Sequence, residues 1–224
     1  MTALIEFPTK DVVAVACAIF RQQGFIKRND YQIVPEGCEP KKANSSLLYN
    51  HFLNSEKIEF TDADAEEAET IIDYLRGLSF KAFERGLTDF ETNVLKFVNA
   101  GSVGKDKLGI AASLPNVYKR KLEADNWTSR EAELARTSEY VGLLNKRNDF
   151  TVKIEHVRSI PSTGSYLYTC SENDKNIVKF FNSSKIAEPG DEITVAAYVK
   201  SHAVSKYSNG KETMINRIKI LNQN

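Results

Sequence analysis

The sequence has little of what defines several large classes of protein. Its 224 residues carry 30 acidic and 30 basic side chains, so the formal net charge is zero. A protein that grips duplex nucleic acid by its phosphates alone is usually basic overall, so any nucleic-acid site here must be a local patch. No apolar run approaches the roughly 20 residues of a membrane helix. The first residues, MTALIEFPTKD, lack the basic and apolar segments of a signal peptide, so we expect no membrane partner.

Cysteine and histidine are also scarce. The three cysteines lie far apart in the sequence, which argues against a disulfide framework and fits a reducing cytoplasm. The three histidines have no partner at the spacing of metal ligands. The spacing of serine, histidine and aspartate residues suggests no catalytic triad. The spacing of cysteine and histidine residues suggests no catalytic pair. We therefore expect no metal, no cofactor and no enzymatic activity.

The hydrophobic pattern divides the chain near residue 145. Before it, apolar residues recur at helical spacing, which predicts a mainly helical domain over residues 1–145. Four helices are predicted to begin at a threonine and one at a proline: Thr9, Thr61, Thr88, Thr128 and Pro115. Thr88 and Thr128 each precede a glutamate by three residues, the spacing of a capping box.

After residue 145 the period changes to two. Five strands are predicted over residues 146–224, in the segments DFTVKIEHVR, GSYLYTC, NIVKFF, DEITVAAYVK and KETMINRIKIL. A tight turn joins the second and third strands, and a longer loop joins the fourth and fifth. This pattern favours an α+β chain that ends in a five-stranded OB-fold barrel, with an SH3-like barrel as the structural alternative.

The segments GSYLYTCSENDKNIVKFF and GDEITVAAYVKSHAVSKYSNGKETMINRIKIL resemble the OB-fold domain of phage-type single-stranded-DNA-binding proteins and related replication proteins. The resemblance covers residues 146–224. It implies a non-enzymatic protein of the host cytoplasm that binds single-stranded DNA or RNA, DNA above all, during phage-type DNA replication or recombination. Replication or recombination proteins would be its partners. Such proteins often recruit partners through an acidic tail, whereas this chain ends RIKILNQN, so we do not expect that role to carry over.

The hairpin of the second and third strands is the first candidate site. Strand alternation predicts that Leu167, Val178 and Phe180 face the barrel core. The remaining large side chains would face outward and offer rings for bases and a cation for phosphates. These are Tyr166, Tyr168, Ile177, Lys179 and Phe181. The alternative is that the helical half packs over this face and buries it.

A second candidate site follows along the chain. Between residues 200 and 219 five basic residues stand against one acid, Glu212. With a tyrosine between two of the lysines, they could form a clamp on the phosphate backbone. This group is Lys200, Lys206, Tyr207, Lys211, Arg217 and Lys219. A solvated edge is the structural alternative, and a module that docks a replication or transcription protein is the functional one.

Overall fold

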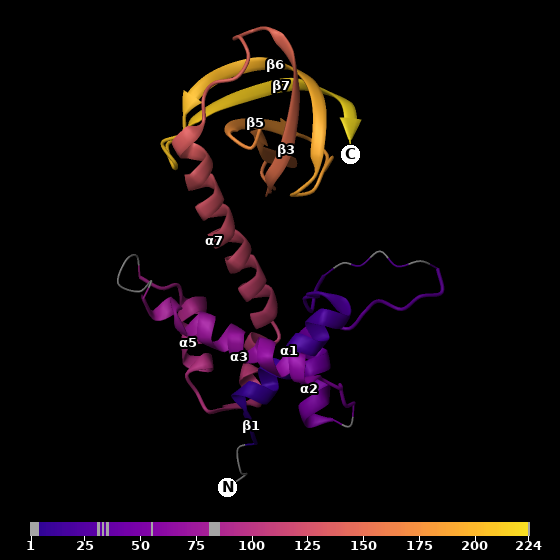
Figure 1. Cartoon of the computed structure of the whole chain (residues 1–224). Helices are drawn as coiled ribbons and strands as arrows, with labels where there is room; N and C mark the ends of the chain where they lie inside the picture. The colour runs from indigo at the N-terminus through magenta and orange to yellow at the C-terminus, as the bar shows by residue number, and fades with distance from the viewer. Residues whose placement is uncertain are drawn as a thin grey trace. The chain divides into compact units, whose positions relative to one another are not determined.

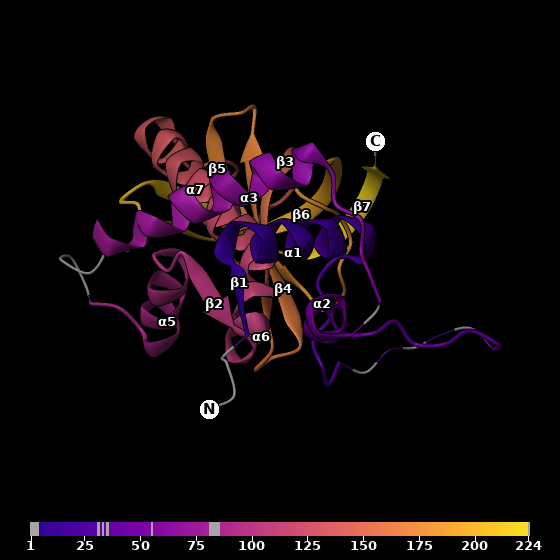
Figure 2. The same ribbon diagram turned by 90° about the horizontal axis from the view of Figure 1, so that it is seen from below.

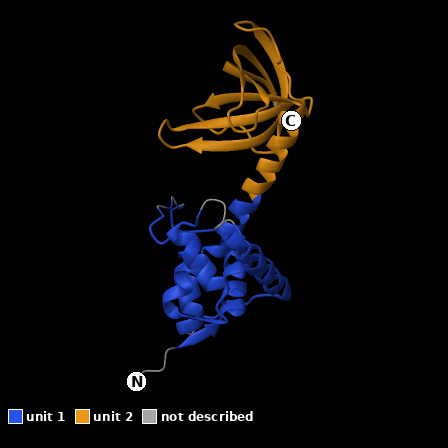
Figure 3. Cartoon of the chain, turned by 90° about the vertical axis from the view of Figure 1, so that its left-hand side faces the viewer, with its two compact units in different colours: residues 1–122 blue, residues 123–224 orange. Residues whose placement is uncertain are grey.

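The computed structural model describes residues 5–30, 32, 34, 36–54, 56–80 and 86–223. The chain forms two compact units, residues 1–122 and residues 123–224 (Figure 3). The division falls inside helix α7 (Leu114–Thr137) and not at residue 145. Strand β3 begins at Arg147, so the change of period marks the switch from helix to strand. The second half of α7 belongs with the barrel.

The N-terminal unit is built around a buried helix. Its elements are β1 (Glu6–Pro8), α1 (Thr9–Gln23), α2 (Asn44–Leu53), α3 (Asp62–Arg76), α5 (Asp89–Val98), β2 (Ser102–Gly104), η1 (Lys105–Lys107), α6 (Leu108–Ala111) and the start of α7. Residues 12–19 of α1 are at most 1 % exposed, as expected of a helix that is apolar on all sides. Helix α3 lies beside α1 (Figures 1 and 2), and β1 pairs antiparallel with β2.

Two capping boxes fix helix starts in this unit. The box of Thr88 and Glu91 opens α5 as the sequence predicts, and Thr61 forms a second one with Asp64 at the start of α3. The box expected at Thr128 is wrong because that residue lies inside α7, where its hydroxyl donates to the carbonyl of Ala124 (2.9 Å). A continuous helix leaves no free N–H groups there for a cap to satisfy.

The hydrogen bonds of the Asp64 carboxylate predict that the stability of this unit falls at acid pH. Arg21 donates two hydrogen bonds to it (2.9 and 2.8 Å), and these bonds do most to lower its pKa from 3.8 to about 2. The stabilisation is therefore complete above pH 3.8 and is lost as the pH falls through about 2. We expect Asp64→Asn to lower the free energy of unfolding by about 2 kcal/mol at pH 7 and by much less at pH 2. Denaturant unfolding at both pH values tests this, and an equal loss at both would contradict it.

The C-terminal unit is a closed barrel preceded by the second half of α7. Its strands are β3 (Arg147–Ile160), β4 (Ser165–Glu172), β5 (Asn176–Asn182), β6 (Glu192–Val204) and β7 (Lys211–Gln223). They close in the order β3-β4-β5-β7-β6, with β5 parallel to β7 and every other pair antiparallel. This order confirms the α+β class and the OB-fold barrel, and it excludes the SH3-like alternative.

Two features are absent from the residues that the structure describes. None of their helices combines the length and the apolar character needed to cross a bilayer. Within the same residues, no three or more acidic, histidine or cysteine side chains gather closely enough to hold a metal ion.

Candidate nucleic-acid interface

Strand β4 has the opposite phase to the one that the sequence predicts. Tyr168 points into the barrel core and is 0 % exposed. Its ring stacks on Phe180 with centroids 4.8 Å apart, and its hydroxyl oxygen accepts a hydrogen bond from the backbone N–H of Ile186 (2.7 Å). Tyr166 is half-buried against the same core, while Leu167 lies outside it. The outward placement of both tyrosines is therefore wrong, because a buried tyrosine is tolerated where its hydroxyl finds a partner.

Helix α7 covers much of the outer face of β3, β4 and β5. The ring of Trp127 stacks on His156 with centroids 4.9 Å apart. Arg130 donates to both carboxylate oxygens of Glu155 (3.2 and 2.8 Å), and Glu155 accepts a further hydrogen bond from Ser171 (2.7 Å). These contacts take up polar groups that a ligand would otherwise meet. Helical residues therefore pack over this face of the hairpin, as in the alternative given by the sequence.

Lys179 is buried beneath this helix. Its side chain is 13 % exposed and its ammonium group pairs with Glu212 (2.5 Å) and Glu131 (3.7 Å). Two carboxylates compensate one cation, so little positive charge is left for a phosphate. The sequence places this lysine correctly on the outer face but misses its pairing with Glu212 of β7 and Glu131 of α7. The expectation that it faces a ligand is wrong.

Phe181 remains accessible. It is 51 % exposed and lies opposite Leu167 on the outer face, two pairs beyond the lysine. Arg158 is paired with Leu167 from the other side and is also exposed. The uncovered end of the hairpin therefore keeps one of the five predicted outward residues as an open ring.

The loop between β6 and β7 is exposed at its tip and held by side-chain contacts at its base. Tyr207 is 94 % exposed at its tip and Lys206 is exposed beside it. Lys211 is engaged, because its ammonium group pairs with Glu139 (2.5 Å) and lies 5.6 Å from the ring centroid of Tyr140. The hydrogen bond to Glu139 raises the pKa of Lys211. Of the two lysines of the expected clamp, Lys206 is therefore the one without an ion pair to any residue that the structure describes.

Gly210 shows how closely that loop meets the helix. A Cβ atom built on this glycine would lie 2.6 Å from both Cα and Cβ of Ala135 in α7. Real Cβ atoms do not approach backbone so closely, so only glycine fits at this contact. The Asn-Gly pair that the sequence suggests as a turn is also where the loop rests on the helix.

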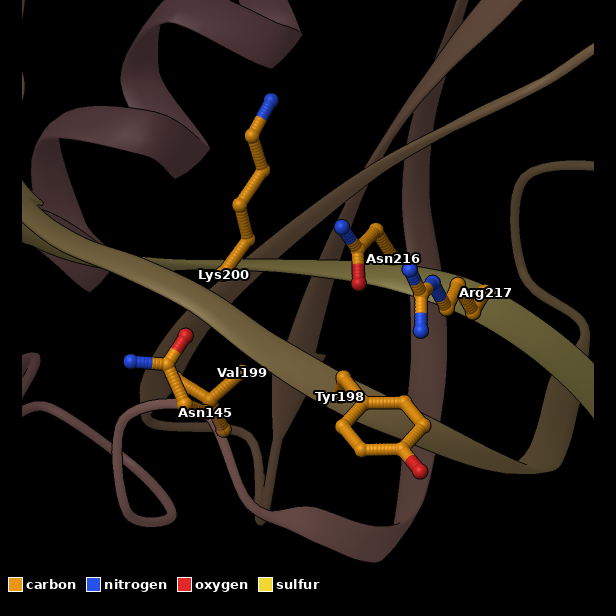
Figure 4. A pocket seen from close by; sticks show the side chains of 6 residues that line it. All are labelled: Asn145, Tyr198, Val199, Lys200, Asn216 and Arg217. Atoms are coloured by element: carbon orange, nitrogen blue, oxygen red, sulfur yellow. The ribbon is translucent and has the colours of Figure 1, made fainter.

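The remaining predicted cations gather on the outer face of β6 and β7. Lys200 and Arg217 line a shallow hollow of about 280 Å³ together with Tyr198 (Figure 4). Tyr198 pairs with Arg147 of β3 on one side and with Asn216 of β7 on the other. We call Arg147, Tyr198, Lys200, Arg217 and Lys219 the arginine–tyrosine face.

A β-bulge sets the position of Arg217. One residue of β6 separates Ala196 from Tyr198, whereas two residues of β7 separate their partners Lys219 and Asn216. Arg217 is one of these two and adopts a left-handed φ of 51°. Such a φ is uncommon for a residue other than glycine, and bulges are known to redirect side chains next to functional sites.

Both arginines contact the tyrosine ring. The guanidinium carbon of Arg147 lies 5.4 Å from the ring centroid of Tyr198, and that of Arg217 lies 5.6 Å from it. Both distances are within the range of a cation–π interaction. The ring therefore holds two flexible cationic side chains in fixed places on the surface.

Among the residues that the structure describes, the cations of this face have no carboxylate partner. Within the described residues, no ion pair involves Arg147, Lys200, Arg217 or Lys219. Asp149 is on the same face two pairs further along β3 than Arg147, opposite Ala196. This part of the barrel therefore carries a local surplus of positive charge on a chain whose net charge is zero.

Two members of this face were missed by sequence reasoning. Tyr198 and Lys200 stand two residues apart in AAYVK, so the alternation alone could have placed the tyrosine outward beside the lysine. Arg147 could not have been found, because its neighbourhood depends on the register between β3 and β6.

Comparisons of the chain with models of protein families, with curated proteins and with solved structures found no match.

Proposed function

We propose that the chain binds single-stranded nucleic acid through the arginine–tyrosine face. The observation that carries the proposal is the pair of arginines without carboxylate partners that are fixed over one tyrosine ring on an exposed sheet face. Arginine suits phosphate because its planar fork donates two parallel hydrogen bonds and its flat face stacks on aromatic rings. Lys200 and Lys219 add charge that needs no particular geometry.

The biological setting remains the one that the sequence resemblance suggests. The protein would cover or present single-stranded DNA during phage-type replication or recombination, in the host cytoplasm and without an enzymatic activity of its own. An OB-fold barrel is compatible with this role but serves many others, so the role rests on the face and not on the fold.

A titration of the full chain into a fluorescently labelled thymidine oligonucleotide tests the proposal. We expect binding at low salt, and we expect Arg147→Ala and Arg217→Ala each to weaken it about tenfold, the loss of one charge-assisted hydrogen bond. Lys175→Ala is the matched control. It removes one exposed cation from the turn between β4 and β5 and should change the affinity less than twofold. Equal losses from all three variants would contradict the proposed face.

The competing function is protein docking, and salt separates the two. Binding to phosphates weakens steeply as salt rises because counterions are released, whereas an apolar interface responds little. Exposed apolar side chains do occur on the barrel unit, such as Leu143 and Leu144 in the turn before β3. Nothing in the structure identifies what would cover them, so nucleic-acid binding is the function that the geometry favours.

A further inference from the structure

We infer that the bound strand is held by its phosphates and leaves its bases turned away from the arginine–tyrosine face. This inference rests on the proposed function and specifies which part of the ligand the face touches. Tyr198 is the one aromatic member of the face. Its ring is already engaged by two guanidinium groups, at 5.4 and 5.6 Å.

The strand order explains why little of the ring is left for a base. Strands β3 and β7 flank β6 on opposite sides, so Arg147 and Arg217 approach Tyr198 from opposite sides of its strand. The ring itself is half-buried, whereas both arginines are exposed. A base that stacked on this ring would have to displace a guanidinium group that is already bound there.

The edges of the two guanidinium groups are what the face offers. An arginine that stacks through its flat side keeps its N–H groups at its rim, in the plane that matches phosphate oxygens. Arg147 uses one of these groups in a long contact of 3.4 Å to the carbonyl of Ala196. Because the two guanidinium carbons lie 5.4 and 5.6 Å from one centroid, they are at most 11.0 Å apart, so both can contact phosphates of the same strand.

Bases turned away from the protein stay available for pairing. Contacts to phosphate and sugar carry no sequence information, so affinity would be nearly independent of base composition. The ligand class is thus the sugar–phosphate backbone of a single strand. A strand held in this way could pair with a complementary strand while it is still bound.

An abasic strand tests the inference directly. The full chain is titrated at one salt concentration with a thymidine oligonucleotide and with a deoxyribose-phosphate strand of the same length without bases. We expect the two affinities to agree within about threefold. Stacking is worth roughly 1–3 kcal/mol per base, so even one stacked base would weaken the abasic strand by about fivefold or more.

The possible outcomes separate this inference from the proposed function. Binding of the thymidine strand with much weaker binding of the abasic strand would overturn the inference alone and would point to stacking on exposed rings such as Tyr207 or Phe181. Failure of both strands to bind would overturn the proposed function as well. Equal binding of both strands supports both.

Variants of Tyr198 test its role as a positioning residue. Tyr198→Leu removes the ring that holds both arginines, and we expect it to weaken the thymidine and abasic strands by the same factor, about fivefold. Tyr198→Phe keeps the ring and should restore the parent affinity. If Tyr198→Leu weakened only the thymidine strand, the ring would be stacking on a base and the inference would fail.

Discussion

Replacement of Tyr168 by alanine is expected to lower the free energy of unfolding of the barrel by about 3–5 kcal/mol, the range measured for large aromatic side chains removed from cores. The ring is fully buried against Phe180. Its removal leaves a cavity and also removes the hydrogen bond that its hydroxyl accepts from the N–H group of Ile186. Denaturant unfolding of the full chain, followed through the transition of the barrel, measures the loss.

Tyr168→Phe is the control for this variant. It keeps the ring in the core and removes only the hydroxyl, so it should cost about 1 kcal/mol. Single-strand affinity, corrected for the folded fraction, should be unchanged in both variants because the residue does not reach the surface. An alanine variant that kept its stability and lost affinity would show that the ring contacts a ligand.

The second large effect is expected at Lys179. Lys179→Met should destabilise the barrel by about 3 kcal/mol, because Glu131 and Glu212 would be left mostly buried without a cation. Methionine keeps much of the side-chain volume, so the loss reports the charge and not a cavity.

Lys211→Met provides the comparison for that variant. Its pair with Glu139 is exposed, with 43 % and 60 % of the two side chains accessible to solvent. An exposed pair contributes little to stability because solvent screens it, so the two lysine variants should differ clearly in unfolding. Similar losses for both would show that burial does not strengthen the network of Lys179.

The strands were predictable because apolar and polar residues alternate along a strand wherever one face of the sheet is polar. This alternation fixes β3 and β6, whose inward residues Val152, Ile154, Ile193 and Val195 are all buried. It fails in β4 because residues 166–168 are all large and partly apolar, so a pattern of period two reads equally well in either phase. In the structure, Tyr168 stacks on Phe180 and its hydroxyl finds a partner in the link between β5 and β6, and local sequence pattern reveals neither contact.

The covering of the hairpin was not predictable from local pattern. The segments on either side of Thr128 read as two helices, yet the structure has one helix from Leu114 to Thr137. No proline or glycine interrupts this segment after Pro115, so nothing forces a break. Once the helix is continuous, Glu131 projects over the sheet and meets Lys179, a contact between residues 48 positions apart. The candidate face likewise depends on the register between distant strands.

The slope of log affinity against log salt tests the central claim most directly. The account predicts that the double variant Arg147→Ala/Arg217→Ala reduces the magnitude of this slope by about 1.4, since each lost contact to a single-strand phosphate removes roughly 0.7. The double variant Lys206→Ala/Lys211→Ala is the comparison and should reduce it by no more than about 0.7, because Lys211 is already paired with Glu139. If the arginine variant kept the slope of the parent protein while single strands still bound, the arginine–tyrosine face would not be the nucleic-acid interface.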